Sequence, residues 1–386
     1  MTERAATPLR LLVVLPSWVG DTAMATPTLR RLRTALPGIF IGALARPGID
    51  QLLNGSDLID EIHTFQPHGI MAPKRAASKV RGRAYDTALL LTNSFSTALI
   101  ARLAFIPRRV GYSRDSRGML LTDPVRPPRN ADNSWKITPA VDYYWNLASH
   151  LLDEPEIDWS IHTPTDCRQI PLALPGDARL ELPVTDKDNA AAEAILGRSG
   201  LTDSPFALLN PGGNNPAKRW PAERFAQLAD HLRHRHNIGV LVNGSPAESD
   251  LCDAIAGQSS ASQGHKPIAS LPGLGNTLGS LKALCRRASV MITNDTGPRH
   301  IAAAAGTPLV TLFGPTDPRW TTIPVHPHLD GSPSETVLVA DETLPPEASA
   351  NDHPDRCRVD RITLERVIAE TDEQLRRSGG PVRQPG

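Results

Sequence analysis

The chain has 386 residues, more than one hydrophobic core usually serves, so two domains are expected. A hydrophobic content of 40% and a charged content of 21% are typical of a soluble globular protein. The 41 basic and 41 acidic residues balance, which argues against nucleic-acid binding through bulk charge. The four cysteines lie far apart without Cys-x-x-Cys or Cys/His spacing, so they predict neither a structural zinc site nor a disulfide framework.

The first half of the chain alternates strand and helix patterns. Leu11–Leu15 is a continuous apolar run, typical of a strand buried on both faces of a parallel sheet. The run is too short for a signal-peptide core, and no later stretch reaches the length of a membrane span, so we expect a cytoplasmic protein. Further strands are expected at Phe40–Leu44, Ile59–Phe65, Thr87–Leu91 and Arg109–Tyr112, and helices within Asp21–Leu36 and Ser94–Ala104. Pro27 should either kink the first helix or mark its start.

A segment rich in proline and polar residues, 166–188, precedes a second alternating series. Here we expect helices at Lys187–Arg198, Ala222–His234, Ala247–Ala256 and Leu278–Arg287, and strands at Phe206–Leu209, Ile238–Val242, Val290–Thr293 and Leu309–Phe313. Thr363–Arg376 is predicted to be a last helix. The double alternation predicts an α/β protein with two doubly wound parallel sheets facing each other across a cleft.

The most informative segment is NDTGPRHIAAAAGTPLVTLFGPTDPRWT, which begins at Asn294. Asp295, Thr296 and Gly297 lie where a strand ends and a helix begins, the place where open α/β sheets bind ligands. The first N–H groups of a helix have no intrahelical partner and favour an anion, so the segment predicts a phosphate site. The alternative is an ordinary helix start in which Asp295 or Thr296 serves only as the N-cap.

The turn PSWVGD follows the first predicted strand. Gly20 allows a sharp turn, and Asp21 lies at the junction of loop and helix. A carboxylate at this position has the chemistry of a general base that takes a proton from a hydroxyl. An N-cap aspartate is the alternative.

The turn NPGGNNPAKRWP follows the strand at Phe206–Leu209. Gly212 and Gly213 permit a ligand to approach the backbone closely, and Lys218 and Arg219 bring positive charge suited to phosphate. The spacing is not that of a Walker A loop. A solvated basic turn is the alternative.

The turn VNGSPAESD follows the strand at Ile238–Val242 and places Glu248 near a helix start. A carboxylate at such a point in a nucleotide-binding fold often holds ribose hydroxyls. The alternative is an acidic residue favoured by the helix dipole.

Together these segments resemble glycosyltransferase family 9, the lipopolysaccharide heptosyltransferases, and most closely the heptosyltransferase II type. The matches run in family order from about Leu9 to Thr321, and RRVGY at Arg108–Tyr112 adds a weaker one. The resemblance implies a GT-B fold of two Rossmann-like domains. We place the acceptor domain at residues 1–180, the nucleotide-sugar domain at 181–360, a C-terminal helix at 361–378 and a flexible tail at 379–386.

The resemblance also implies roles for single residues. Asp21 corresponds to the catalytic base and Lys218 to the lysine that holds the diphosphate. The Asp295–Gly297 turn lies at the phosphates and heptose, with His300 one turn along the helix. Glu248 is the candidate for the ribose, with Asp250 as a rival. Gly20, Gly212, Gly213 and Arg219 belong to loops near the donor.

The implied reaction transfers heptose from ADP-heptose to a lipid-linked core oligosaccharide. Fixed donors, namely Lys218 and the amides at Thr296 and Gly297, can stabilise the departing diphosphate without a metal or another cofactor. With Asp21 on the opposite face of the sugar, the anomeric carbon would invert.

Three other functions are compatible with parts of the pattern: transfer of a different sugar, epimerisation of a sugar nucleotide, and nucleotide-sugar binding without catalysis. An oxidoreductase is disfavoured because the first turn is not GxGxxG. A group of basic residues offers charge for anionic headgroups or acidic core sugars at a peripheral membrane contact, although each also suits a solvated loop. These are Arg75, Lys79, Arg81, Arg83, Arg126 and Arg129.

Overall fold

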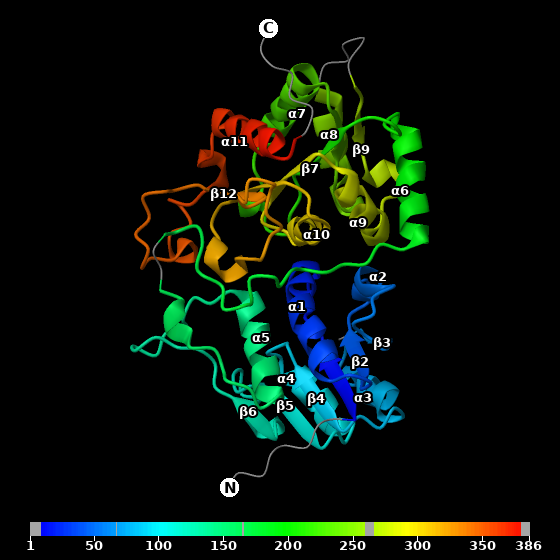
Figure 1. The fold of residues 1–386 in the computed structure, drawn as a ribbon, viewed down its shortest axis with the longest axis vertical. Coiled ribbons are helices and arrows are strands. Elements are labelled where there is room, and N and C mark those ends of the chain that lie inside the picture. The colour runs from blue at the N-terminus through cyan, green and yellow to red at the C-terminus, as the bar shows by residue number, and fades with distance from the viewer. Residues whose placement is uncertain (1–8, 67, 164–165, 259–265, 380–386) are drawn as a thin grey trace. The chain divides into compact units, whose positions relative to one another are not determined.

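The computed structural model describes residues 9–66, 68–163, 166–258 and 266–379 (Figure 1). These residues form two compact units. The first comprises the described residues of Met1–Thr163 with Ile170–Glu181 and Trp320–Ile323. The second comprises the described residues of Pro164–Gln169, Leu182–Arg319 and Pro324–Gly386. Apart from Gly379, the predicted tail at 379–386 lies outside the described residues.

The first unit is built around a parallel sheet with the order β3-β2-β1-β4-β5-β6. Its strands are β1 (Arg10–Val14), β2 (Phe40–Ala45), β3 (Glu61–Thr64), β4 (Thr87–Leu90), β5 (Arg108–Tyr112) and β6 (Asp123–Val125). Its helices are α1 (Val19–Ala35), α2 (Ile49–Leu53), α3 (Ala72–Arg81), α4 (Phe95–Leu103) and α5 (Ala140–Leu151). Alternate residues of the central strands pack under α3 and α4, whereas α1 and α5 pack together against the sheet's other face. This is the predicted doubly wound arrangement.

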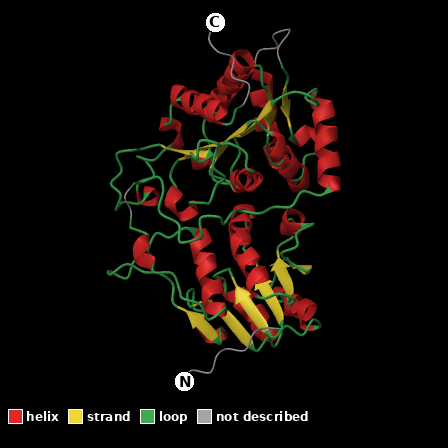
Figure 2. Cartoon of the chain, viewed as in Figure 1, coloured by secondary structure: helices red, strands yellow, loops and turns green. Residues whose placement is uncertain are grey.

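The second unit repeats the architecture, with the order β12-β11-β10-β7-β8-β9. Its strands are β7 (Phe206–Asn210), β8 (Gly239–Val242), β9 (Ile268–Ser270), β10 (Val290–Asn294), β11 (Leu309–Phe313) and β12 (Glu335–Val339). Its helices are α6 (Asp186–Ser199), α7 (Ala222–His236), α8 (Ser249–Gln258), α9 (Leu278–Arg287), α10 (Gly297–Ala305) and α11 (Leu364–Arg377). Side chains of α7, α8 and α11 share one core with the sheet. Helices α6, α9 and α10 form the other helical layer (Figures 1 and 2).

Helix α1 starts at Val19 and continues through Pro27, so the expectation that Pro27 might mark its start was wrong. A proline in this position leaves the carbonyl of Ala23 without its helical N–H donor. The hydroxyl of Thr26 donates to that carbonyl at 2.7 Å and thereby satisfies it. The hydroxyl oxygen of Thr26 in turn accepts the N–H of Glu181 at 2.9 Å. The neighbouring threonine therefore lets the helix tolerate its proline.

Strands β6, β9 and β12 and helices α2, α3 and α5 were not predicted. Strands β6 and β9 have three residues each, too few to show a period. The helix expected at Ala247–Ala256 is a 3-10 turn, Pro246–Glu248, followed by α8. Proline and glycine interrupt apolar patterns near these elements, and packing against the sheets determines their structure.

A buried ion pair anchors the segment that follows the FGPTDPRW sequence. Arg319 is fully buried and binds both carboxylate oxygens of Asp317, with Nε–Oδ1 at 2.8 Å and Nη2–Oδ2 at 2.6 Å. Its guanidinium also donates to the carbonyls of Pro346 and Ala348. The pair thus joins the end of the motif to a loop that sequence analysis left without an interpretation.

We predict that Asp317→Asn lowers the free energy of unfolding by about 3 kcal/mol or more, because it leaves a buried guanidinium without its counter-ion. Urea denaturation of the full chain, followed by circular dichroism, measures the change. The matched control is Asp360→Asn, which breaks the exposed Arg358–Asp360 pair and should shift the midpoint far less. Equal shifts in the two variants would contradict the anchoring role.

Candidate functional site

The candidate site of the second unit lies where β7 and β10 end. These two strands are neighbours, but the chain leaves them in opposite directions across the sheet, toward β8 and toward β11. Such a switch in strand order opens a crevice at the carboxyl ends of the strands. The turns that follow β7 and β10 contain the predicted Gly212–Arg219 and Asp295–Gly297 segments. The fold therefore brings two of the sequence motifs to one edge.

The start of α10 has the geometry of an anion site. Thr296 occupies the N-cap position with an extended backbone, but its side chain makes no capping hydrogen bond. Its hydroxyl instead accepts from Nδ2 of Asn210 at 2.8 Å and donates to the carbonyl of Asn294 at 3.3 Å. Thr296 thus stands at the N-cap without capping the helix through its side chain, and the amides at the start of α10 stay uncapped by it.

Lys218 and Asp295 form an ion pair across the two turns, with 2.8 Å between Nζ and Oδ2. The lysine side chain is 23% exposed, and that of Asp295 is 9% exposed. Burial alone would raise the pKa of Asp295, but Lys218 and Arg299 outweigh it and hold the pKa below its ordinary value. Lys218 is thus part of a charge network, contrary to the solvated-turn alternative. Arg219 does lie exposed, with Nε donating to the carbonyl of Gly213.

Glu248 connects the glycine turn to the turn after β8. Its Oε1 accepts the N–H of Gly213 at 2.8 Å, and Oε2 accepts the N–H and hydroxyl of Ser245 at 2.9 and 2.8 Å. Burial raises the pKa of Glu248, but these hydrogen bonds outweigh it and the net pKa is lowered. A Cβ at Gly212 would lie 2.3 Å from Oε1, so only glycine fits there. Glu248 thus lies in the first helical turn, where an acidic residue is favoured by the dipole, and forms a capping box with Ser245. Asp250 lies exposed in α8.

Three buried asparagines, which sequence analysis missed, hold these turns together. Nδ2 of Asn243 donates to Oδ1 of Asn210 at 2.7 Å. Nδ2 of Asn294 donates to the carbonyl of Pro211 at 2.7 Å, and its Oδ1 accepts the N–H of Trp220 at 3.2 Å. Each asparagine ends or directly follows a buried apolar strand. That pattern, repeated three times, is the sequence signal that would have found them.

Two further side chains of α10 lie behind the turn. Arg299 is 1% exposed and binds Glu335 of β12 through both carboxylate oxygens, at 2.7 and 3.0 Å. His300 is buried, and its Nδ1 donates to the carbonyl of Thr296 at 3.3 Å. Burial and the charge of Arg299 lower the pKa of His300 to about 4. The imidazole is therefore neutral at neutral pH and supports the turn through its hydrogen bond.

Asp21 lies at the equivalent switch in the first unit, where β1 and β4 are neighbours. It is the third residue of α1, and the N-cap is Trp18, so the N-cap alternative for Asp21 is wrong. The hydroxyl of Tyr144 in α5 donates to Oδ1 of Asp21 at 3.2 Å. Burial raises the pKa of Tyr144 well above its ordinary value, which keeps this donor protonated. Gly20 is buried in the first turn of the same helix.

The predicted basic residues do not gather in one place. Arg75 and Lys79 line a pocket of about 470 Å³ between α3 and the loops that follow β2 and β3. Lys79 donates to the carbonyl of Thr64 at 2.8 Å. Arg83 instead pairs with Glu61 at 2.7 Å. The other three are placed as follows: Arg81 lies over the ring of Phe105, Arg129 over that of Trp135, and Arg126 is exposed. No described helix is long and apolar enough to cross a membrane.

Two Rossmann-like units, each with polar turns at the carboxyl edge of a parallel sheet, are the architecture of the GT-B fold. The model of glycosyltransferase family 9 (heptosyltransferase) matches residues 74–338. The chain belongs to this family and is a glycosyltransferase.

Similar proteins agree with this assignment. The lipopolysaccharide heptosyltransferase 2 of Escherichia coli is 30% identical over 319 residues, which cover 81% of this chain and 85% of that protein. The protein of the same name from Salmonella typhimurium is 29% identical with the same coverage. The structure of the E. coli ADP-heptose LPS heptosyltransferase II superposes with a TM-score of 0.74 and 26% identity, over 96% of this chain and all of that one. The GT-B fold expected from the sequence is confirmed.

The buried His300 predicts a pH dependence of stability. Its pKa is about 4 in the folded chain, against an ordinary value of 6.5, so the unfolded chain binds a proton more readily between these values. The neutral, buried His300 therefore makes its full contribution to the free energy of unfolding above about pH 6.5. As the pH falls toward 4, the free energy of unfolding decreases by about 2–3 kcal/mol. Urea denaturation at pH 7.5 and 4.5 should show a smaller loss for His300→Gln than for the wild type. Equal losses would contradict this role of His300.

Proposed function

We propose that the protein is an inverting, metal-independent transferase that moves L-glycero-D-manno-heptose from ADP-heptose to the inner core of lipopolysaccharide. The heptosyltransferase names of the relatives support the sugar and the acceptor, and the similar E. coli structure is that of an ADP-heptose LPS heptosyltransferase. The observation that carries the proposal is the position of Lys218, which pairs with Asp295 just before α10. The side chain of Thr296, the N-cap of α10, makes no capping hydrogen bond. Such a site suits a departing nucleoside diphosphate.

Lys218 is our candidate for stabilising the leaving diphosphate. An ammonium group has three protons, so Nζ can donate to Asp295 and still donate to a phosphate oxygen. Asp295 would then orient the lysine while the amides of Thr296 and Gly297 bind the same anion. Because these donors are fixed before the reaction, they need little reorganisation when negative charge develops.

The nucleoside would extend toward Glu248. A carboxylate oxygen can accept more than one hydrogen bond, so Oε1 can bind a ribose hydroxyl beside the N–H of Gly213. Asp250 is the rival, because it is exposed in the first turn of α8. Because Gly212 and Gly213 have no side chains, the ligand could approach their backbone closely.

Asp21 is our candidate for the general base. Its contact with Tyr144 orients the carboxylate, which would accept the proton of the acceptor hydroxyl. Attack on the face opposite the diphosphate inverts the anomeric carbon. The pocket with Arg75 and Lys79 would bind acidic groups of the lipid-linked acceptor, at a peripheral contact with the inner membrane surface.

Product analysis tests the proposal as a whole. Purified protein, ADP-heptose and truncated lipopolysaccharide acceptors should give one added heptose with inverted anomeric configuration. Transfer from another nucleotide sugar but not from ADP-heptose would show that ADP-heptose is not the donor. Binding of ADP-heptose without any product would favour a non-catalytic binding protein.

We predict that Asp21→Asn lowers turnover by about a hundredfold or more and leaves the affinity for ADP-heptose nearly unchanged. Asparagine has almost the same shape, but it cannot take the proton. Steady-state kinetics and calorimetric titration on the same protein measure the two quantities. Tyr144→Phe, which removes only the positioning hydrogen bond, should have a smaller effect on turnover. Near-normal turnover of Asp21→Asn would show that Asp21 is not the general base.

We predict that Lys218→Ala weakens ADP binding and also lowers turnover, with a loss of transition-state stabilisation of about 2–4 kcal/mol. The charge matters most when the diphosphate departs, so the transition state should suffer more than the ground state. Calorimetry with ADP and kinetics with the full substrate pair provide the readouts. Lys187→Ala, an exposed lysine in the first turn of α6, is the matched control. Unchanged values for both variants would remove Lys218 from the site.

A further inference from the structure

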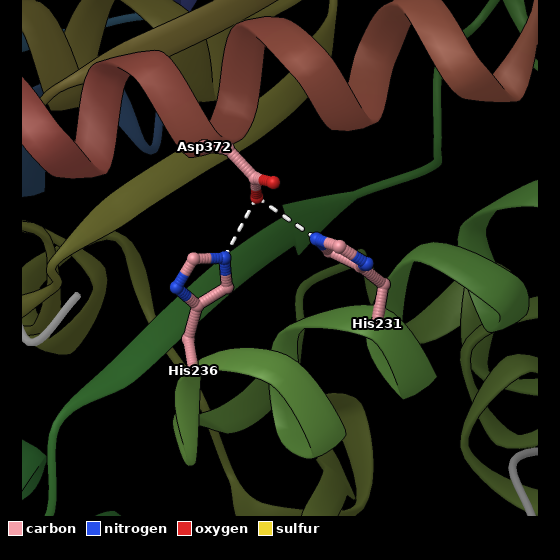
Figure 3. Close-up of side chains that lie close together, drawn as sticks. All are labelled: His231, His236 and Asp372. Carbon is pink, nitrogen blue, oxygen red and sulfur yellow. Dashed lines mark hydrogen bonds and ion pairs between the residues drawn. The ribbon is translucent and has the colours of Figure 1, made fainter. Parts of the chain in front are cut away.

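Three side chains of types that can bind a metal ion meet where α7 ends near α11. His231 and His236 belong to α7, and Asp372 belongs to α11. Nε2 of His231 lies 2.8 Å from Oδ1 of Asp372, and Nε2 of His236 lies 2.7 Å from the same oxygen. In Figure 3 both rings point toward this carboxylate. Within the part of the chain that the structure describes, this is the one group of three such residues whose ligand atoms all lie within 4.8 Å of one another.

Two imidazoles and one carboxylate form a donor set that suits zinc and related divalent ions. Zinc binds nitrogen and oxygen at about 2.0–2.2 Å, which places neighbouring ligand atoms of a tetrahedron roughly 3.4 Å apart. The present contacts are hydrogen bonds of 2.8 and 2.7 Å, about 0.6–0.7 Å shorter. A small outward movement of the side chains would therefore admit an ion in place of the two ring protons.

The position in the fold favours a cation. His236 is the last residue of α7, and the next residue, Asn237, has a left-handed backbone that ends the helix. The carbonyl end of a helix carries partial negative charge. Because His231 and Asp372 come from within regular helices, the donors are held by rigid elements, as a preorganised site requires.

Access also fits a bound ion. The side chain of Asp372 is 36% exposed and that of His231 is 22% exposed. Solvent thus reaches one side of the cluster, where water can serve as a fourth ligand.

We propose that His231, His236 and Asp372 bind one zinc-class divalent ion, which fastens α11 to α7. The cluster lies at the opposite end of α7 from the Lys218 turn, and the 15-residue helix is about 22 Å long. The ion would therefore stabilise the second unit and take no part in the departure of the diphosphate. The inference is independent of the donor and acceptor proposed above.

The test uses the full chain, freed of metal with a chelator and then dialysed. Calorimetric titration with zinc sulfate should show one strong equivalent, and cobalt(II) chloride should give the visible absorption of a tetrahedral nitrogen and oxygen site. Zinc should also raise the melting temperature. Transfer activity should be the same with and without chelator, so a failure of the proposed transferase function would leave this result readable.

His231→Gln is the decisive variant, because glutamine can still donate a hydrogen bond to Asp372 but is a poor zinc ligand. It should weaken zinc binding by about 100-fold or more and abolish the rise in melting temperature, while its metal-free melting temperature stays near that of the wild type. Asp372→Asn should also lose zinc binding. His234→Gln, exposed on the same helix, is the control and should bind zinc like the wild type. The absence of a strong equivalent in the wild type, or equal binding by His231→Gln and the control, would overturn the proposal.

Discussion

The candidate site for the nucleotide sugar depends on the hydrogen bonds of the buried Asn294 side chain. Asn294 stands at the end of β10, and its amide holds the backbone on both sides of the glycine turn, at Pro211 and at Trp220. Because an amide offers a donor and an acceptor at once, one neutral residue satisfies buried backbone groups of both types. The position of Lys218 within that turn follows from this contact, and so does its distance from Asp295.

The charged side chains near the candidate site of the second unit form ion pairs that differ in burial. Arg299 is neutralised by Glu335 deep in the sheet, and Lys218 is shared with Asp295 nearer the surface. A fully paired buried ion is costly to disturb, whereas a partly exposed lysine can add a phosphate to its partners. The difference in burial thus separates a structural pair from one able to respond to a ligand. Neutral His300 adds no competing charge beside the turn.

The sequence was sufficient to predict the doubled α/β architecture, the central strands and the turns that follow them. These features depend on local apolar runs and on glycine, proline and aspartate at strand ends, which a single chain displays directly. It was not sufficient for β9 or β12, whose place at the sheet edges depends on tertiary pairing. It also missed Asn210 and Asn243, because a polar residue at a strand end looks like part of the loop until its partner is known. Glu248 shows the same limit, since its contacts come from two turns far apart in the sequence.

A motif read as one unit therefore contains residues with different physical tasks. In the segment from Asn294 to Thr321, the turn at Asp295 and Thr296 presents charge and amides, whereas Asp317 and Arg319 are buried and hold a distant loop. Burial and hydrogen-bond partners separate the two groups, because a side chain with every polar atom bound inside the fold has nothing left to offer a ligand. Lys218, which contacts this turn and is partly exposed, keeps that capacity. Resemblance locates the segment, and the contacts decide which of its residues are available for chemistry.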